Sequence, residues 1–155
     1  MFTKLMKSPL GELILAANER ALIGIYFKTS PLTPLHQVER GEILKLAEQQ
    51  LGEYFAGKRK EFNLPLEFNG TDFQKKVWTA LLEIPYGQTK SYADIAKQVG
   101  SPKAVRAVGL ANSKNPISII AACHRVIGSN GKLTGYAGGL HNKEYLLRLE
   151  HAQVA

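Results

Sequence analysis

The sequence contains one cysteine, Cys123, among 155 residues. A single cysteine excludes an internal disulfide, and the four histidines are scattered with no pair at the spacing of zinc ligands. We therefore expect neither a disulfide nor a metal to hold the fold. With 45% hydrophobic residues, the chain can bury a real core, either as one domain or as two small packed subdomains.

Long apolar runs are also missing. No stretch approaches the roughly 20 consecutive apolar residues that a membrane-spanning helix needs, and residues 1–9 lack the apolar centre of a signal peptide. The sequence therefore predicts a cytoplasmic protein that does not enter a membrane.

Acidic residues are scarce in the second half of the chain. Residues 71–155 carry eleven Lys and Arg against five Asp and Glu, a net charge of +6, whereas residues 1–70 are close to neutral at +1. A basic half suits an anionic partner such as nucleic acid, because each neutralised phosphate releases counterions. A basic surface that only keeps the protein in solution explains the charge equally well.

The first half of the chain predicts a small antiparallel sheet. Apolar runs at residues 13–17 and 21–27 flank a polar triplet at 18–20, which is typical of a β-hairpin. A short strand at residues 2–6 is expected to precede this hairpin. The three strands would need a cover on at least one face to bury their apolar side chains.

One helix is predicted to supply that cover. Apolar residues recur at helical spacing over residues 43–55, and Gly57 is a stop signal. Residues 61–70 contain a proline and an Asn-Gly turn, which indicate a short strand followed by a linker. We therefore expect a subdomain at residues 1–70 and a second at 71–155.

The second half predicts three short helices, each with a marked start. The capping signals are Thr71 with Gln74, Ser91 with Asp94, and Ser101 with Pro102. The Val99-Gly100 turn between the second and third helices is typical of a helix-turn-helix. Other all-helical folds contain the same arrangement, so the pattern alone leaves the motif open.

Residues 115–139 are rich in glycine, and their pattern predicts extended chain and turns rather than helix. The apolar run at 117–122 predicts a buried strand that ends at Cys123, where the chain becomes polar at His124. A final helix is expected at about residues 142–150. The sequence shows neither an internal repeat nor a low-complexity tract.

Cys123 is a candidate nucleophile because a buried strand is expected to give way to a polar loop at its position. The alternative is a small buried apolar residue, the commoner role of a lone cysteine. A thiol with a pKa of about 8.5 is mostly protonated at neutral pH and needs a nearby base or positive charge. His124 is the candidate base. Neighbours on an extended segment point to opposite faces, so we expect a bridging water or a bend between them. A papain-like protease is disfavoured, because its Cys and His come from distant parts of a longer chain.

Several motifs around Cys123 extend this picture. They are Ile-Pro-Tyr-Gly-Gln-Thr at 84–89, Ser-Tyr at 91–92, Pro-Lys-Ala-Val-Arg-Ala-Val-Gly at 102–109, Asn-Pro at 115–116, Ala-Cys-His-Arg-Val at 122–126 and Gly-Tyr-Ala-Gly-Gly at 135–139. In these motifs the chain resembles the O6-alkylguanine-DNA alkyltransferases of bacterial type. The resemblance covers most of residues 71–150, and the first half matches mainly in layout.

The resemblance implies an α+β (α/β) fold. Residues 1–70 would form a ribonuclease-H-like antiparallel-sheet subdomain, and residues 71–155 a mostly helical subdomain with a winged helix-turn-helix. In this family the motif lies in the minor groove, with residues 102–111 as the recognition helix. Small residues on that helix would approach the DNA backbone or pack helix against helix, and these residues are Ala104, Ala107, Gly109 and Ala111.

The resemblance also implies a reaction. Cys123 would attack the alkyl carbon of an O6-alkylguanine in double-stranded DNA, with His124 and a water removing its proton and Glu150 polarising the histidine. Tyr92 would promote rotation of the base out of the duplex, and Arg106 would fill the gap. A thioether is a poor leaving group, so transfer would be irreversible and stoichiometric. The protein would act as a monomer without a cofactor, and O4-alkylthymine is a possible second substrate.

The remaining implied roles concern the pocket. Asn115 would shape the active-site turn, or be an ordinary Asn-Pro turn. Tyr136 would wall the pocket, the backbone amide of Ala137 would donate to O6, and Lys143 would add positive character. Arg125 is grouped with the residues that bind substrate and DNA.

Departures from the family pattern and two rival functions accompany the resemblance; Ser118 stands where many relatives have proline, and Ala137 where the human type has serine. The family usually has proline immediately before the cysteine, and this chain has Ala122, which relaxes the φ restriction there and adds a backbone N–H. A lesion binder without catalysis is the first rival, but such relatives carry tryptophan at the position of Cys123. A regulator that reads particular sequences is the second, and would need base-edge contacts and a palindromic site.

Overall fold

The computed structural model describes residues 1–28, 41–128, 136 and 138–151. The chain divides into two compact units, Met1–Phe68 and Asn69–Ala155. The first is a small sheet with one helix and the second is mostly helical, so the predicted α+β class is confirmed. Among the described residues, no helix has the length and apolar character needed to cross a membrane.

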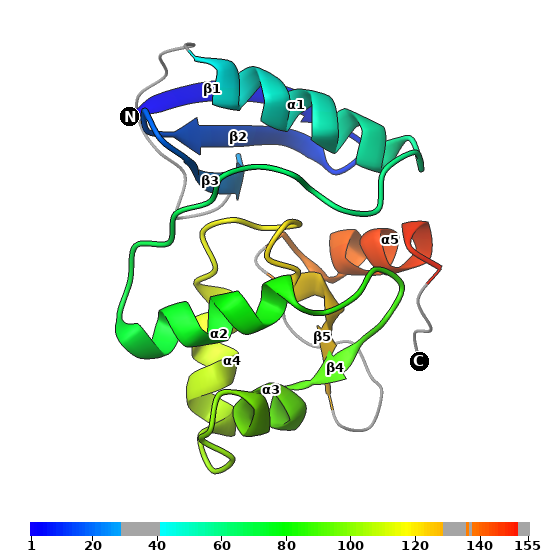
Figure 1. The fold of residues 1–155 in the computed structure, drawn as a ribbon. Coiled ribbons are helices and arrows are strands. Elements are labelled where there is room, and N and C mark those ends of the chain that lie inside the picture. Colours follow the sequence, from blue (N-terminus) through cyan, green and yellow to red (C-terminus); the bar gives the residue numbers. More distant parts are fainter. Residues whose placement is uncertain (29–40, 129–135, 137, 152–155) are drawn as a thin grey trace. The chain divides into compact units, whose positions relative to one another are not determined.

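The first unit is built on an antiparallel sheet with the strand order β1-β2-β3 (Figure 1). Its strands are β1 (Phe2–Ser8), β2 (Gly11–Ala17) and β3 (Leu22–Phe27), as the apolar runs predict. The Asn18 side chain accepts hydrogen bonds from the amides of Arg20 and Ala21, both at 2.8 Å, and so closes the β2–β3 turn.

Helix α1 (Glu42–Phe55) covers one face of this sheet (Figure 1). Its buried face is set by apolar residues at helical spacing, namely Leu44, Ala47, Leu51 and Tyr54. Gly57 adopts a positive φ of 75° just past the helix end, which glycine tolerates without strain. The predicted helix and its stop are confirmed.

The short strand predicted within residues 61–70 is wrong. This segment makes only an isolated parallel bridge, between Leu66 and Leu22. The carbonyl of Pro65 accepts from the Leu22 amide at 2.8 Å, and the Glu67 amide donates to the Leu22 carbonyl at 3.1 Å. Proline lacks an N–H, so it cannot donate to a longer ladder.

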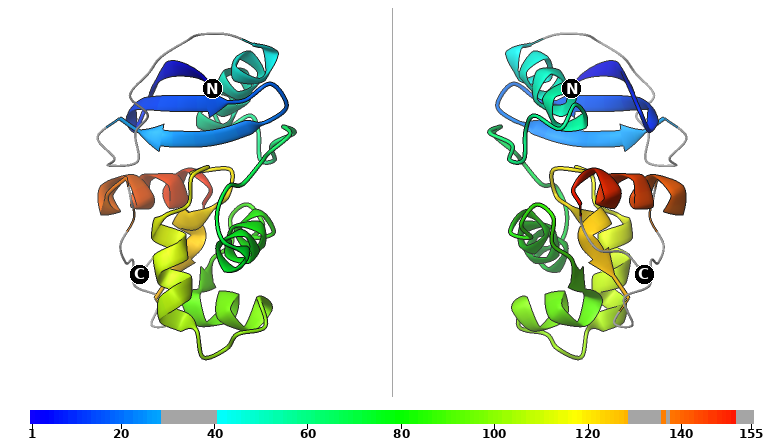
Figure 2. Two further views of the ribbon diagram at one scale, coloured as in Figure 1. Left: turned by 90° about the vertical axis from the view of Figure 1, so that its left-hand side faces the viewer. Right: turned by 90° about the vertical axis from the view of Figure 1, so that its right-hand side faces the viewer.

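The second unit contains α2 (Asp72–Leu82), α3 (Tyr92–Gln98) and α4 (Val105–Ser113). Capping boxes at Thr71 and Ser91 begin α2 and α3 as predicted. The Trp78 indole donates to the Ala111 carbonyl at 2.8 Å and joins α2 to α4. Helices α3 and α4 lie next to each other, joined by a short loop (Figure 2), in which Gly100 has a φ of 81°.

The predicted start of the third helix is wrong. Helix α4 begins at Val105 with Ala104 as its N-cap, and no side chain caps it. The Ala104 amide donates to the Ser101 carbonyl at 2.8 Å, so residues 101–104 form a tight turn. Ser101 and Pro102 therefore belong to this turn, and the second helix of the helix-turn-helix is Val105–Ser113 rather than residues 102–111.

The strand predicted over residues 117–122 is also wrong. These residues form consecutive buried turns, in which the Ala121 amide donates to Ile117 and Ile119 has a positive φ of 75°. A short apolar run marks burial but does not distinguish a strand from a buried turn. Paired strands occur instead on either side, where β4 (Lys90–Ser91) runs parallel to β5 (Val126–Ile127). The final helix α5 (Leu140–Leu149) is present as predicted and begins slightly earlier.

Candidate functional site

Cys123 lies at the start of a single 3₁₀ turn, Cys123–Arg125, between the buried turns and β5. Its amide donates to the Ala121 carbonyl at 2.8 Å, and the Arg125 amide donates to the Ala122 carbonyl at 3.0 Å. The bend expected between Cys123 and His124 is therefore present, because the backbone is not extended there. The thiol is only 2% exposed.

Burial raises the pKa of the Cys123 thiol above its ordinary value. A hydrogen bond with the Asn115 side chain, the positive charge of Lys143 and a hydrogen bond with Ser118 oppose this effect without cancelling it. The thiol is therefore protonated at neutral pH in this structure. A reaction that uses the sulfur as a nucleophile needs a group that takes its proton.

Asn115 holds the turns that lead to Cys123. Its side-chain amide donates to the Ala121 carbonyl at 2.7 Å, and its side-chain oxygen accepts from the Ile117 amide at 3.1 Å. The Asn115 side chain is buried, and it joins both ends of the segment that precedes the thiol. This role is wider than that of an ordinary Asn-Pro turn.

His124 and Glu150 form a fully buried pair, with 2.8 Å between Nε2 and Oε2. Burial lowers the pKa of His124 and outweighs the opposing effect of Glu150, so the imidazole is neutral. Burial also opposes ionisation of Glu150, but hydrogen bonds from His124 and Arg125 prevail and lower its pKa to about 2.

The protonation state follows from this pair. An ionised carboxylate accepts hydrogen bonds and donates none, so Nε2 of His124 carries the proton and donates it to Glu150. Nδ1 is then left with its lone pair. It is buried and has no hydrogen-bond partner among the residues that the structure describes. Such an atom is ready to accept a proton.

Arg125 was grouped with the residues that bind substrate and DNA, but its guanidinium is buried and hydrogen-bonded within the protein. Nε donates to Oε1 of Glu150 at 2.7 Å and Nη2 to Oε2 at 2.8 Å, a bidentate pair. Nη1 donates to the Ile84 carbonyl at 2.6 Å, and the guanidinium carbon lies 5.7 Å from the centre of the Tyr86 ring. Arg125 orients Glu150.

Tyr86 also contacts the end of α5, since its hydroxyl donates to the Leu149 carbonyl at 3.3 Å. Gly87 approaches the same region, because a Cβ there would lie 3.1 Å from the Glu150 carbonyl oxygen. Residues 84–87 thus pack against the C-terminal end of α5 and against the backbone of Glu150. The sequence signal was present in the 84–89 motif, but it gave no reason to connect that motif with Glu150.

Lys143, on α5, is completely buried, and its Nζ donates to the Val126 carbonyl at 2.6 Å. Burial lowers its pKa to about 8, although the charge of a Cys123 thiolate would raise it. Most molecules therefore keep the ammonium charged at neutral pH. The positive character expected from Lys143 is available near the sulfur.

Two of the residues expected to contact DNA, Tyr92 and Arg106, lie on α3 and α4. Tyr92 is the first residue of α3 and is half-buried, and its ring passes close to Gly109 of α4. Arg106 is exposed on α4, while Tyr136 is half-buried. Ala137, expected to supply a backbone donor, lies outside the described residues.

The small residues of the helix-turn-helix divide between the two roles expected of them. Ala107 is exposed, whereas Ala111 is buried and its carbonyl accepts from Trp78. The exposed positions leave room for a close partner. The buried positions pack helix against helix.

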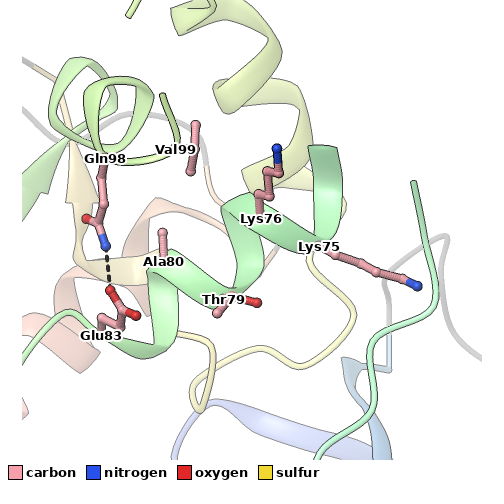
Figure 3. A pocket seen from close by; sticks show the side chains of 7 residues that line it. All are labelled: Lys75, Lys76, Thr79, Ala80, Glu83, Gln98 and Val99. Atoms are coloured by element: carbon pink, nitrogen blue, oxygen red, sulfur yellow. Dashed lines mark hydrogen bonds between the residues drawn. The ribbon is translucent and has the colours of Figure 1, made fainter. Parts of the chain in front are cut away.

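A groove of about 420 Å³ lies between α2 and the end of α3 (Figure 3), lined by Lys75, Lys76, Thr79, Ala80, Glu83, Gln98 and Val99. Gln98 donates to Glu83 at 2.6 Å across it. Lys75 and Lys76 point in different directions, so they do not converge on one anion. None of the residues that line this groove belongs to the site predicted around Cys123.

Ala122 leads to a first prediction, because its φ of −80° lies within the range that proline adopts. We expect Ala122→Pro to raise the free energy of unfolding by about 0.4–1 kcal/mol, since it restricts the unfolded chain. Thermal unfolding followed by circular dichroism measures the change in Tm.

Ala121→Pro is the matched control for this substitution. The Ala121 amide donates to the Ile117 carbonyl at 3.0 Å, and proline would remove that hydrogen bond. We expect this variant to unfold at a lower temperature than the wild type. If Ala122→Pro lowered Tm as much as Ala121→Pro, the residue before the thiol would not accept proline in this chain.

Two family models match the chain. The model described as "6-O-methylguanine DNA methyltransferase, ribonuclease-like domain" matches residues 1–68, and the one described as "6-O-methylguanine DNA methyltransferase, DNA binding domain" matches residues 72–152. Together they cover almost the whole chain.

Individual proteins match over nearly their full length. The methylated-DNA–protein-cysteine methyltransferase of Methanosarcina acetivorans is 53% identical over 97% of this chain and 98% of its own. The crystal structure of Mycobacterium tuberculosis OGT in complex with DNA has a TM-score of 0.91 and 48% identity, covering 97% of this chain and 93% of that one. An O6-methylguanine DNA methyltransferase from Methanococcus jannaschii has a TM-score of 0.56 and 32% identity, covering 91% and 95%.

Proposed function

This chain belongs to the 6-O-methylguanine DNA methyltransferases, a family of DNA-repair transferases, and on that premise we propose that Cys123 accepts an alkyl group from O6 of guanine in DNA. One observation carries the proposal. A buried thiol begins a 3₁₀ turn whose next residue is a neutral histidine, and that histidine is bonded to a buried carboxylate. A thiol that only filled the core would not need this arrangement.

The proton moves first. Cys123 gives its proton through one bridging water to Nδ1 of His124, whose lone pair is available because Nε2 donates to Glu150. The imidazolium that forms is stabilised by the carboxylate, which stays ionised because its pKa is about 2. Arg125 keeps the carboxylate oriented through two hydrogen bonds. Lys143 stabilises the thiolate by its charge.

The alkyl group moves next. A lone pair of the Cys123 sulfur forms the S–C bond while the C–O6 bond breaks, and the bonding electrons pass to the guanine. The guanine anion takes up one proton from water at N1, and the His124 imidazolium releases to water the proton that it took from the thiol, so that ordinary guanine and a neutral imidazole are restored. Backbone and side-chain donors near the base, with Ala137 and Tyr92 as candidates, stabilise the anion.

The transfer happens once per molecule. The thioether that forms is a very poor leaving group, and none of the side chains that the structure describes around Cys123 is a nucleophile that could displace it. The chain is therefore consumed one molecule per lesion. Cys123 also favours this function over the rival of a lesion binder without catalysis, which has tryptophan at this position.

DNA is the partner, and α3 and α4 of the second unit carry the contact. Helix α4 lies in the minor groove, Tyr92 promotes rotation of the alkylated guanine out of the duplex, and Arg106 enters the gap. Residues 1–70 form the ribonuclease-H-like subdomain and residues 71–155 bind DNA and carry out transfer. Both work within one monomer. Because the nucleophile must stay a free thiol, the reducing cytoplasm suits the reaction.

The proposal is tested by titrating duplex DNA that carries one O6-methylguanine with increasing amounts of protein. We expect repaired guanine to rise linearly and to stop at one lesion per protein molecule. O4-methylthymine in the same duplex tests the second substrate. Continued turnover beyond one equivalent would contradict the stoichiometric mechanism, and binding without any repair would favour the lesion binder.

A further inference from the structure

Leu110, in the middle of α4, is 59% exposed, more than any other large apolar side chain that the structure describes in the second unit. Leucine side chains inside folded domains are usually buried. Val105 at the start of the same helix is 38% exposed. Helix α4 therefore presents apolar surface to its surroundings.

This exposure follows from the periodicity of α4. Val108, Ala111 and Asn112 are buried and form the face that packs against the unit, where the Ala111 carbonyl accepts from Trp78. Arg106 and Leu110 lie four residues apart, one turn of helix, on the opposite and exposed face. Leu110 has no place in the packed face, so it is available to a partner.

We propose that Leu110 is a second DNA-contacting side chain of α4, an apolar contact in the minor groove beside the step that Arg106 enters. This inference rests on the proposed function, in which α4 lies in that groove. Proteins that bind the minor groove often insert apolar side chains between base steps, which partly unstacks the bases and kinks the duplex. A leucine one turn from the arginine is positioned for this task.

The charge around Leu110 identifies the partner as DNA. Helix α4 contains no acidic residue, and Lys103 and Lys114 stand just beyond its two ends. A second copy of this chain, with a net charge of +7, would be repelled by this basic surface. An apolar side chain within a basic helix suits the apolar sugar edges and charged phosphates of a duplex.

Leu110 is assigned to duplex binding and not to the chemistry at the sulfur. We expect Leu110→Ala to weaken binding to O6-methylguanine duplex about fivefold to tenfold, since the variant has less apolar side chain to bury against the DNA. The slope of log Kd against log salt should be unchanged, because no phosphate contact is removed. Arg106→Ala, in contrast, removes a positive charge from the same face, so it should both weaken binding and reduce the steepness of that slope.

Three further measurements make the test specific. Leu110→Met keeps the apolar reach and should bind like the wild type. Leu46→Ala removes another exposed leucine, on α1 of the first unit, and should leave Kd unchanged. The Tm of Leu110→Ala should stay close to that of the wild type, because the side chain is exposed.

Several outcomes would overturn the inference. Wild-type affinity of Leu110→Ala for duplex would do so, as would an equal loss in Leu110→Met or a changed salt slope. A change only in self-association, measured by sedimentation, would indicate a second copy as the partner. If wild-type protein neither bound nor repaired the duplex, the proposed function itself would fail. If it did both and Leu110→Ala matched it, only the role of Leu110 would fail.

Discussion

Cys123→Ser is expected to abolish alkyl transfer while leaving DNA binding intact. A serine hydroxyl ionises far less readily than a thiol and is a weaker nucleophile, so the proton relay has no effective nucleophile to activate. The substitution removes little volume from a site that is already well filled. Transfer is measured by the loss of O6-methylguanine from a duplex, and binding by the change in fluorescence anisotropy of the same duplex.

Cys123→Ala is the companion variant, because it removes the hydroxyl as well. Both variants should bind the alkylated duplex with a Kd close to that of the wild type, and both should unfold cooperatively. Complexes of these variants with damaged DNA should persist, since the lesion is never removed. Transfer by either variant at the wild-type rate would rule out Cys123 as the acceptor.

Glu150→Gln is expected to reduce both activity and stability. The carboxylate accepts hydrogen bonds on both oxygens from His124 and Arg125, whereas an amide offers only one acceptor oxygen and turns a donor toward one of them. Disrupting a buried ion pair costs about 3 kcal/mol or more. The imidazolium formed during transfer also loses its counterion, so the rate should fall roughly a hundredfold.

Glu144→Gln is the matched control, on the helix α5 that ends at Glu150. Glu144 and Arg148 form an exposed ion pair four residues apart, and such pairs contribute about 0.5 kcal/mol or less. We expect this variant to unfold and react like the wild type. A large loss of stability in Glu144→Gln, or none in Glu150→Gln, would contradict the importance given to the buried network.

The same carboxylate predicts a dependence of stability on pH. The pKa of Glu150 is lowered from 4.5 to about 2 in the folded protein. Its contribution to stability is therefore present above about pH 4.5 and is lost as the pH falls toward 2. Urea denaturation of the wild type and of Glu150→Gln should give a difference in stability that shrinks across this window. A constant difference would contradict an ionised Glu150.

Much of the fold could be predicted because its signals are local. The capping boxes at Thr71 and Ser91 satisfy backbone amides within three residues, and the hairpin turn closes on Asn18. The helix start predicted from Ser101 and Pro102 is wrong because the same residue types also begin tight turns. The strand predicted from the apolar run 117–122 is wrong because hydrophobicity indicates burial and does not indicate backbone conformation.

The contacts of the candidate site could not be read from the sequence. Glu150 meets His124 and Arg125 across 26 and 25 residues of chain, and no periodicity connects positions so far apart. Cys123, His124 and Glu150 were named from chemistry and from resemblance. The contacts of Arg125 with Glu150 and of Tyr86 with Arg125 depend on the folded structure and have no signal in the sequence. The same holds for the exposure of Leu110.

The most direct test of the central claim is the mass of the protein after it reacts with duplex DNA containing O6-methylguanine. Intact mass spectrometry followed by peptide mapping should find one added methyl group, carried by the peptide that contains Cys123 and attached to its sulfur. Protein that binds this duplex and keeps its original mass, or that carries the methyl group on another residue, would contradict transfer to Cys123.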